Sequence, residues 1–231
     1  PAAPAPMHPW NFGPVWAHAD LLAAGLLATL RVTGTALAFG IPLGLALALM
    51  RLSRRRALRW PAGAVIEVFR TTPPLVQLFW FFFALPILIE VEMTPYVAAA
   101  LTFSIQSSAF FAEVFRGGIV SVERGQWEAA HALGMDRRQV LRRVVLPQAV
   151  QRMLPAFLER AIELMKTTTL VATVSYADLL FQATEVAQKT FRPLEVYTAA
   201  ALIYFVVIWG ASLVARQFER RVALSGQGLH R

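Results

Sequence analysis

The side chains best suited to chemistry lie in one apolar stretch, residues 149–174. Its central part carries the charged residues Glu159, Arg160, Glu163 and Lys166. On a helix, Glu159, Glu163 and Lys166 share a face, and Arg160 lies about one turn before Glu163. Charges inside a membrane are costly and mark candidate functional groups. The carboxylates would attract an ammonium group and the basic side chains a carboxylate. Because the charges cancel, a self-neutralised network at a helix interface is the equal alternative.

Uncharged polar side chains occur in two other apolar stretches. Gln77 lies in residues 61–89, and Gln106 and Ser107 lie with two further serines in residues 95–115. Such groups should face protein or water rather than lipid. We interpret them first as interhelical hydrogen bonds, worth about 0.6 kcal/mol each. Lining of a solute pathway is the alternative.

Covalent catalysis has little support in this chain. It contains no cysteine, no Gly-Lys pair of a phosphate-binding loop and no HExxH zinc motif, and its four histidines are scattered. We therefore expect no catalytic residue, metal ligand or cofactor in this chain, and a membrane hydrolase is disfavoured.

The composition indicates a membrane protein. Hydrophobic residues make up 57% of the 231 residues and charged residues 16%, against about 25% charged in soluble domains. About 20 apolar residues cross a bilayer core. We predict an all-α integral membrane protein with about five transmembrane helices, the second broken at Pro73-Pro74. The apolar segments are residues 21–50, 61–89, 95–115, 149–174 and 196–215.

The distribution of charge predicts the orientation. Arginines cluster after the first and third segments, whereas residues 1–20 contain no Lys or Arg. Because Lys and Arg are retained in the cytoplasm, we expect the N-terminus outside and the C-terminus inside. We divide the chain into a periplasmic tail (1–20), a transmembrane domain (21–221) and a cytoplasmic tail (222–231). The net charge of +8 then reflects these loops rather than binding of nucleic acid.

Two connecting segments have local signals of their own. Between the last two spans, Ser175 and Asp178 resemble a capping box before a short helix that Pro193 should close. Near the cytoplasmic end, Glu67 with Arg70 and Glu113 with Arg116 have the spacing of helical ion pairs. We interpret both ion pairs as structural. These ion-pair residues are Glu67, Arg70, Glu113 and Arg116.

The segment GQWEAAHALGMDRRQVLRRVVLPQA, residues 125–149, predicts two short helices at an angle. Glu128 to Leu133 favours a helix with an acid at its start, and Gly134 can end it in the left-handed conformation. Asp136 can cap a second helix, with Gln139 at the capping-box position, until Pro147 stops it. Taken alone, the basic stripe would suit a loop resting on anionic lipid headgroups.

The same segment also resembles a known motif. Glu128-Ala129-Ala130, then Gly134, then Leu146-Pro147, match the cytoplasmic loop of bacterial ABC-transporter permeases. Further stretches are similar to the polar amino-acid importers of the histidine, glutamine, arginine and opine type. They are GTALAFGIPLGLALALMRLS, EVFRTTPPLVQLFWFFFALP, AEVFRGGIVSV and FRPLEVYTAAALIY.

The resemblance implies a coupling helix between spans 3 and 4 that docks on a separate ATPase. Ala129 and Ala130 would allow close approach, Glu128 would make a polar contact, and Gly134 would supply the bend, with Leu133 at the helix end. It further implies a multi-pass subunit of the bacterial inner membrane, a dimer with the same or a related permease, two ATPase subunits that bind ATP and Mg, and a periplasmic solute-binding protein. Membrane lipid is the remaining partner.

The chain departs from this branch at the charged stretch. It has Leu158-Glu159-Arg160 where Gly-Asn-Gln is usual. The added charge favours a cationic or zwitterionic solute. A stand-alone ion-coupled carrier or channel, in which Glu159 and Glu163 relay protons, is the alternative function.

Overall fold

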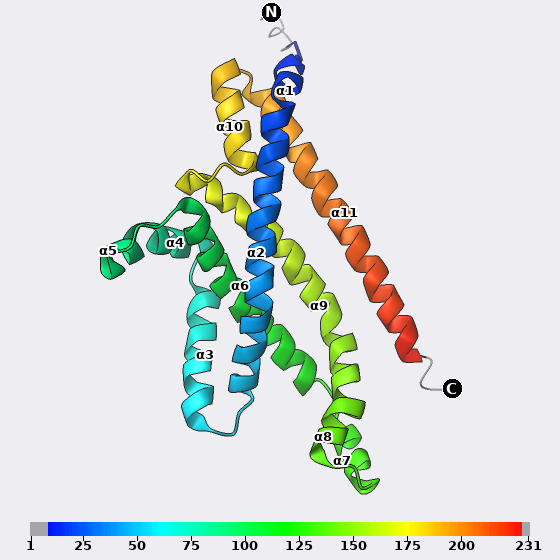
Figure 1. Ribbon diagram of the computed structural model, residues 1–231. Coiled ribbons are helices and arrows are strands. Elements are labelled where there is room, and N and C mark those ends of the chain that lie inside the picture. The colour runs from blue at the N-terminus through cyan, green and yellow to red at the C-terminus, as the bar shows by residue number, and fades with distance from the viewer. Residues whose placement is uncertain (1–8, 228–231) are drawn as a thin grey trace, which may run out of the picture.

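The computed structural model describes residues 9–227, and the remaining terminal residues lie outside the description. All of the regular elements in this range are helices (Figure 1). They are α1 (Gly13–Ala17), α2 (Ala19–Arg51), α3 (Arg56–Thr71), α4 (Pro74–Phe79), α5 (Leu85–Ile89), α6 (Pro95–Val120), α7 (Arg124–Ala132), α8 (Arg137–Gln139), α9 (Leu146–Thr167), α10 (Leu179–Thr190) and α11 (Pro193–Gln227), with π-helical turns at Trp80–Ala84 and Val140–Val145 and a 3-10 helix at Thr168–Val174.

Within residues 9–227, three helices are long and apolar enough to cross a membrane. They are α2, α6 and the Pro193–Arg220 part of α11, and the bent pair formed by α3 and Pro74–Ile89 makes up to four. The predicted fourth span is also a helix, α9, but it lies outside this set. Its five charged residues, Arg152, Glu159, Arg160, Glu163 and Lys166, make it too polar for the same test. A helical membrane protein is therefore confirmed, and the number of five crossings stays a prediction.

The second predicted span is sharply broken. Thr72 and Pro73 are extended, as expected for residues that precede a proline, and the helix axes on the two sides differ by 107°. Figure 1 shows α4 and α5 turned away from the axis of α3. The predicted break at Pro73-Pro74 is confirmed, but the segment is a bent pair rather than one kinked rod.

Gln77 stabilises this bend. The nitrogen of its buried amide, which has two hydrogens to donate, lies within hydrogen-bonding distance of three acceptors: the Phe69 carbonyl (3.1 Å), the Thr72 carbonyl (3.0 Å) and the Thr72 hydroxyl (2.5 Å). Carbonyls freed by the two prolines need such partners inside a membrane. Gln77 thus holds the last turn of α3 against the first turn of α4.

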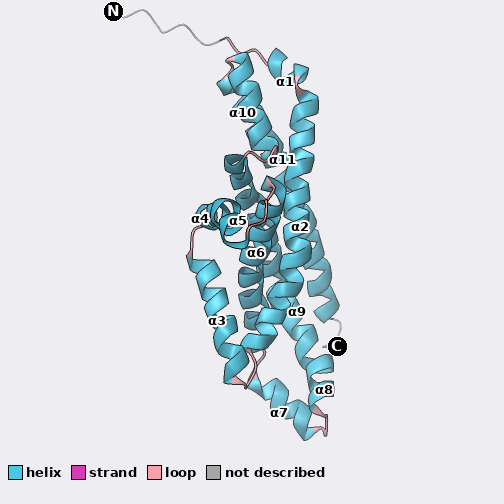
Figure 2. Cartoon of the chain, turned by 60° about the vertical axis from the view of Figure 1, so that its left-hand side comes forward, coloured by secondary structure: helices cyan, strands magenta, loops and turns pink. Residues whose placement is uncertain are grey.

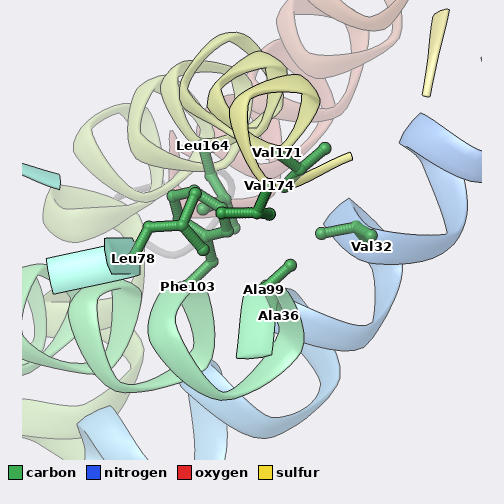
Figure 3. Close-up of a cluster of buried hydrophobic side chains, with 8 residues drawn as sticks. All are labelled: Val32, Ala36, Leu78, Ala99, Phe103, Leu164, Val171 and Val174. Atoms are coloured by element: carbon green, nitrogen blue, oxygen red, sulfur yellow. The ribbon is translucent and has the colours of Figure 1, made fainter. Parts of the chain in front are cut away.

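Helix α2 packs closely on α6, and the contact is made possible by glycine. A Cβ atom built on Gly44 would lie 2.8 Å from the carbonyl oxygen of Ser108 and 2.8 Å from Cβ of Phe111. Only a residue without a side chain fits between the two backbones at this point. The adjoining core draws side chains from α2, α4, α6 and α9 with the 3-10 helix (Figure 3). Its buried members are Val32, Ala36, Leu78, Ala99, Phe103, Leu164, Val171 and Val174.

The end of the molecule that carries α1 and α10 differs from prediction in its caps. Asp178 itself is the N-cap of α10 and accepts from the backbone nitrogen of Phe181 (2.8 Å), while Ser175 adopts a left-handed conformation that ends the 3-10 helix. The expected capping box is therefore wrong. Pro193 does not close α10 either, because a left-handed Phe191 ends that helix and Pro193 begins α11.

The predicted domain boundaries fall inside helices. Helix α1 and the start of α2 lie within the predicted tail of residues 1–20, of which residues 1–8 are outside the description. The predicted boundary between residues 20 and 21 lies within the first turn of α2. Helix α11 continues past residue 221 to Gln227, and residues 228–231 of the predicted tail are outside the description.

Candidate functional site

The helix-bend-helix segment lies at the end of the molecule opposite α1 and α10 (Figure 2). Helix α7 begins at Arg124, four positions before the predicted start, so Glu128 lies within the helix rather than at its N-terminus. The bend is as predicted, since Gly134 has a φ of 76°. Left-handed φ is accessible to glycine without steric cost.

Asp136 forms the predicted capping box of α8. Its carboxylate accepts from the backbone nitrogens of Arg138 (2.7 Å) and Gln139 (2.9 Å), and the Gln139 side-chain oxygen accepts from the Asp136 nitrogen (3.0 Å). The prediction that Pro147 stops the helix is wrong. The π-helical turn bonds Leu146 to Leu141, five residues back, and Pro147 falls in the first turn of α9, where its missing N–H is not needed.

The predicted coupling residues do not all face outward. Glu128, Ala129 and Gly134 are exposed, and Leu133 is 82% exposed. Ala130 is 4% exposed. It belongs to a buried cluster that holds α7 against the π-helical turn and the start of α9: Val122, Ala130, Val140, Val145 and Ala149. Four of the five predicted residues therefore lie on the outer surface of this segment.

A cavity of about 160 Å³ brings together four of the seven predicted pathway residues, from α6 and α9. Arg160 and Glu163 supply opposite charges, and Thr167 lines the wall one turn further along α9. The full lining is Pro74, Gln106, Ser107, Phe110, Phe111, Arg160, Glu163, Leu164 and Thr167. A positive and a negative group thus border one small space.

The other predicted pathway residues lie elsewhere. Lys166 does not line the cavity, although its ammonium lies 3.8 Å from the Glu163 carboxylate, and both side chains are about half exposed. An exposed pair of this kind contributes little stability. Glu159 lies in a neighbouring hollow, and Gln77 braces the bend.

Ser107 is both cavity-lining and structural. Its hydroxyl lies 3.3 Å from the Ala36 carbonyl on α2 and 3.2 Å from the Ser104 carbonyl on its own helix, within hydrogen-bonding reach of both. The expectation of interhelical hydrogen bonding is therefore confirmed for this residue. It fixes α6 against α2 beside the cavity.

Sequence reasoning missed Phe110 and the contact that Arg70 makes with it beside the cavity. The Arg160 guanidinium lies 4.8 Å from the centre of the Phe110 ring, and that of Arg70 lies 5.8 Å from the same ring. Arg70 was expected to pair with Glu67. The other expected pair is present, with Arg116 2.6 Å from Glu113. One signal was available, since Phe110 follows Gln106 by one helical turn.

A second hollow of about 370 Å³ lies next to the cavity, between α3, α6 and α9. It contains Arg152 and Glu159, charged groups of opposite sign. A third hollow of about 650 Å³ follows toward the turn between α2 and α3, with Arg51 and Arg116 beside Glu113. Charges of both signs therefore extend from the cavity along one side of the molecule.

Apolar spanning helices around a series of charged hollows are the architecture of a membrane transport subunit. The family follows from a direct match. Residues 40–224 match the family described as binding-protein-dependent transport system inner membrane component, and the chain belongs to this family. It is therefore an inner-membrane permease subunit, not itself catalytic, of a family in which no cofactor is expected.

Named relatives match nearly the whole chain. The L-cystine transport system permease protein TcyB of Bacillus subtilis is 36% identical over 203 residues, which is 87% of this chain and 86% of the relative. The glutamine transport system permease protein GlnP of Escherichia coli K12 is 34% identical over 216 residues, 93% and 99% of the two chains. A glutamate/aspartate import permease, GltK of Escherichia coli O157:H7, is 34% identical over 94% and 100%.

A solved structure agrees in fold. A chain of the crystal structure of an amino acid ABC transporter with histidines is 35% identical, with a TM-score of 0.87 over 93% of this chain and 100% of that one. An inward-facing MetNI methionine ABC transporter chain is 19% identical with a TM-score of 0.71 over 89% and 98%, a likeness in fold alone.

Proposed function

We propose that this permease serves an ATP-driven importer of a polar amino acid, or of a related small zwitterionic or cationic solute. The observation that carries the proposal is the cavity in which the guanidinium of Arg160 and the carboxylate of Glu163 border one space. A solute with an ammonium and a carboxylate can pair with both groups. The relatives named for glutamine, cystine and glutamate transport support this class of solute.

The pathway would lie between two permease subunits, the same or related chains. Helix α9 then becomes the fifth crossing, because its polar face would be covered by protein and water rather than lipid. Five crossings would put the two termini on opposite sides, and we propose that the N-terminus is outside and the C-terminus inside. This orientation agrees with the arginine-rich turn between α2 and α3 and the arginine-rich α8, which lie toward the same end of the molecule (Figure 1).

Helix α7 would couple the pathway to ATP hydrolysis by docking on one of two ATPase subunits. The contact surface in this proposal is Glu128, Ala129 and Leu133, with Gly134 setting the bend. Ala130 would not touch the ATPase in this proposal, because it lies on the buried side of α7 and packs that helix against the start of α9. A periplasmic binding protein would deliver the solute at the end formed by α1 and α10.

The test is uptake by the complete transporter in proteoliposomes, with a panel of labelled amino acids of positive, zero and negative net charge. We expect uptake only with enclosed ATP, the ATPase and the binding protein, and preference for neutral or cationic solutes. Uptake by the permease alone, driven by a proton gradient, would instead support an ion-coupled carrier.

Glu163→Gln tests the cavity within the same assay. We expect it to lower uptake about tenfold or more, since an ammonium loses its charged partner, while thermal stability changes little because the pair with Lys166 is exposed. Lys166→Met is the matched control, which breaks the same ion pair from outside the cavity. Equal uptake by both variants would assign Glu163 a structural role.

A further inference from the structure

The cavity and the two charged hollows form a series in which neighbours share lining residues. Of the described residues, only Phe110 and Arg160 border both the cavity and the second hollow. Arg70 and Glu113 border both the second and the third. Phe110 and Arg160 therefore form the wall between the cavity and the side of the molecule that leads to the turn between α2 and α3.

Three helices meet at this wall. Phe110 belongs to α6, Arg160 to α9 and Arg70 to α3, and both guanidinium groups lie within 6 Å of the centre of the one ring. Cations are attracted to the face of an aromatic ring, more strongly where water is excluded. The contacts are reversible and noncovalent, and they hold the ring in place only while α3, α6 and α9 keep this arrangement.

The two basic residues stand where their helices can move. Arg70 is next to the end of α3, directly before the 107° bend. Arg160 belongs to α9, which is joined to α7 and α8 through the π-helical turn and packs on α7 through the cluster around Ala130. A displacement of α7 would therefore be transmitted to the Arg160 contact.

We propose that Phe110, held between Arg160 and Arg70, is the inner gate of the transport pathway. When closed it separates the cavity from the cytoplasmic hollows, and movement of α9 releases the ring. The proposal rests on the proposed function and orientation of the permease. Beyond the gate, the paired signs of Arg152 with Glu159 and of Arg116 with Glu113 offer a zwitterion successive partners on its way out.

The absence of cysteine allows a direct test by single cysteines. Thr167→Cys reports from the cavity, Ala156→Cys from the second hollow, and Val214→Cys from the exposed apolar side of α11. Each would be placed in the complete transporter in inside-out membrane vesicles. The rate of reaction with a membrane-impermeant cationic thiol reagent, added at the cytoplasmic side, is the measurement.

The gate is then changed in the Thr167→Cys background. We expect slow reaction in the parent and a rate at least about fivefold higher with Phe110→Leu, the factor that corresponds to loss of one contact of about 1 kcal/mol. Phe110→Tyr keeps the ring and should leave the rate unchanged. Arg160→Lys keeps the charge but loses the planar guanidinium, so it should also raise the labelling rate. This variant replaces Phe110→Leu in the test if that variant does not assemble into the transporter.

Two results would overturn the proposal. If reaction at Thr167→Cys is insensitive to both Phe110→Leu and Arg160→Lys, the ring is not a gate. If Ala156→Cys is as unreactive as Val214→Cys, the second hollow excludes water and is not an exit. ATP-driven uptake by the unchanged, cysteine-free permease in the complete transporter is measured first. Its failure would count against the proposed function, whereas the labelling rates report on the gate by themselves.

Discussion

Gly134 offers a test of how the bend between α7 and α8 works. The residue has a φ of 76°, yet a Cβ atom built on it meets nothing within 4 Å. Substitution should therefore cost only what the left-handed backbone imposes, about 1–2 kcal/mol for an ordinary L-residue. Asparagine tolerates this region better than alanine, and β-branched valine tolerates it worst.

We expect ATP-driven uptake to follow the order Gly134→Asn, Gly134→Ala, Gly134→Val, with the asparagine variant close to the unchanged protein. Each 1 kcal/mol shifts the population of the bent loop by about fivefold. Gly125→Ala is the matched control, because Gly125 lies within α7, a Cβ there also meets nothing within 4 Å, and its backbone is not left-handed. Amounts in the membrane would be compared by immunoblot.

The outcome separates two roles of this glycine. If Gly134→Asn is as inactive as Gly134→Val at equal membrane levels, backbone conformation is not the reason for glycine. A partner surface would then have to lie so close that no side chain fits. That result would refute the conformational explanation and would mean that Gly134 is part of the surface that contacts the ATPase.

Three further predictions concern the scaffold, each measured by unfolding of the purified protein in detergent. Gly44→Ala should destabilise the protein by about 1–3 kcal/mol, because the new Cβ would lie 2.8 Å from the Ser108 carbonyl oxygen. Gly34→Ala is the control and should be neutral or stabilising, because a Cβ at that position has no neighbour within 4 Å. Equal effects of the two substitutions would contradict the close packing of α2 on α6. Gln77→Leu should lower stability by about 1–3 kcal/mol, since the Phe69 and Thr72 carbonyls lose their donor, and an unchanged midpoint would mean that the bend needs no brace. Burial raises the pKa of Asp178, in the loop before α10, from 3.8 to about 6. The folded state therefore binds more protons at this carboxyl than the unfolded state, and stability should fall by about 3 kcal/mol as pH rises from about 4 to 6. Asp178→Asn should keep the cap on Phe181 and remove this dependence of stability on pH, and an unchanged dependence would show that another group causes it.

Local signals at the loop were sufficient to predict its bend and cap. Gly134 and Asp136 act through their own backbone and its nearest neighbours, so their roles are visible in a few residues of sequence. The predicted helix start lies four residues too late, and the predicted stop at Pro147 is wrong. Both errors have one cause, because the π-helical turn and the buried Ala130 are stabilised by packing of α7 on α9, which short-range rules do not contain.

The cavity was only partly predictable. Periodicity along α9 placed Glu163 on a candidate face, and Gln106 and Ser107 were recognised as polar groups in an apolar stretch. Which of them meet depends on how α6 crosses α9, and that crossing is set by long-range contacts. Gln77 has the same polarity as Gln106 but serves the bend, and the Arg70 contact with Phe110 joins residues from two helices without a shared motif.

The unbroken helix from α8 through the π-helical turn to α9 connects two functional regions, the packing against α7 at one end and the cavity at the other. Val145, beside α7, and Arg160, beside the cavity, are separated by about 22 Å at 1.5 Å per residue. Thermodynamic reciprocity then applies to the two ends. If ATPase docking at α7 changes the affinity of the cavity for its solute, occupancy of the cavity must change the affinity for the ATPase by the same factor.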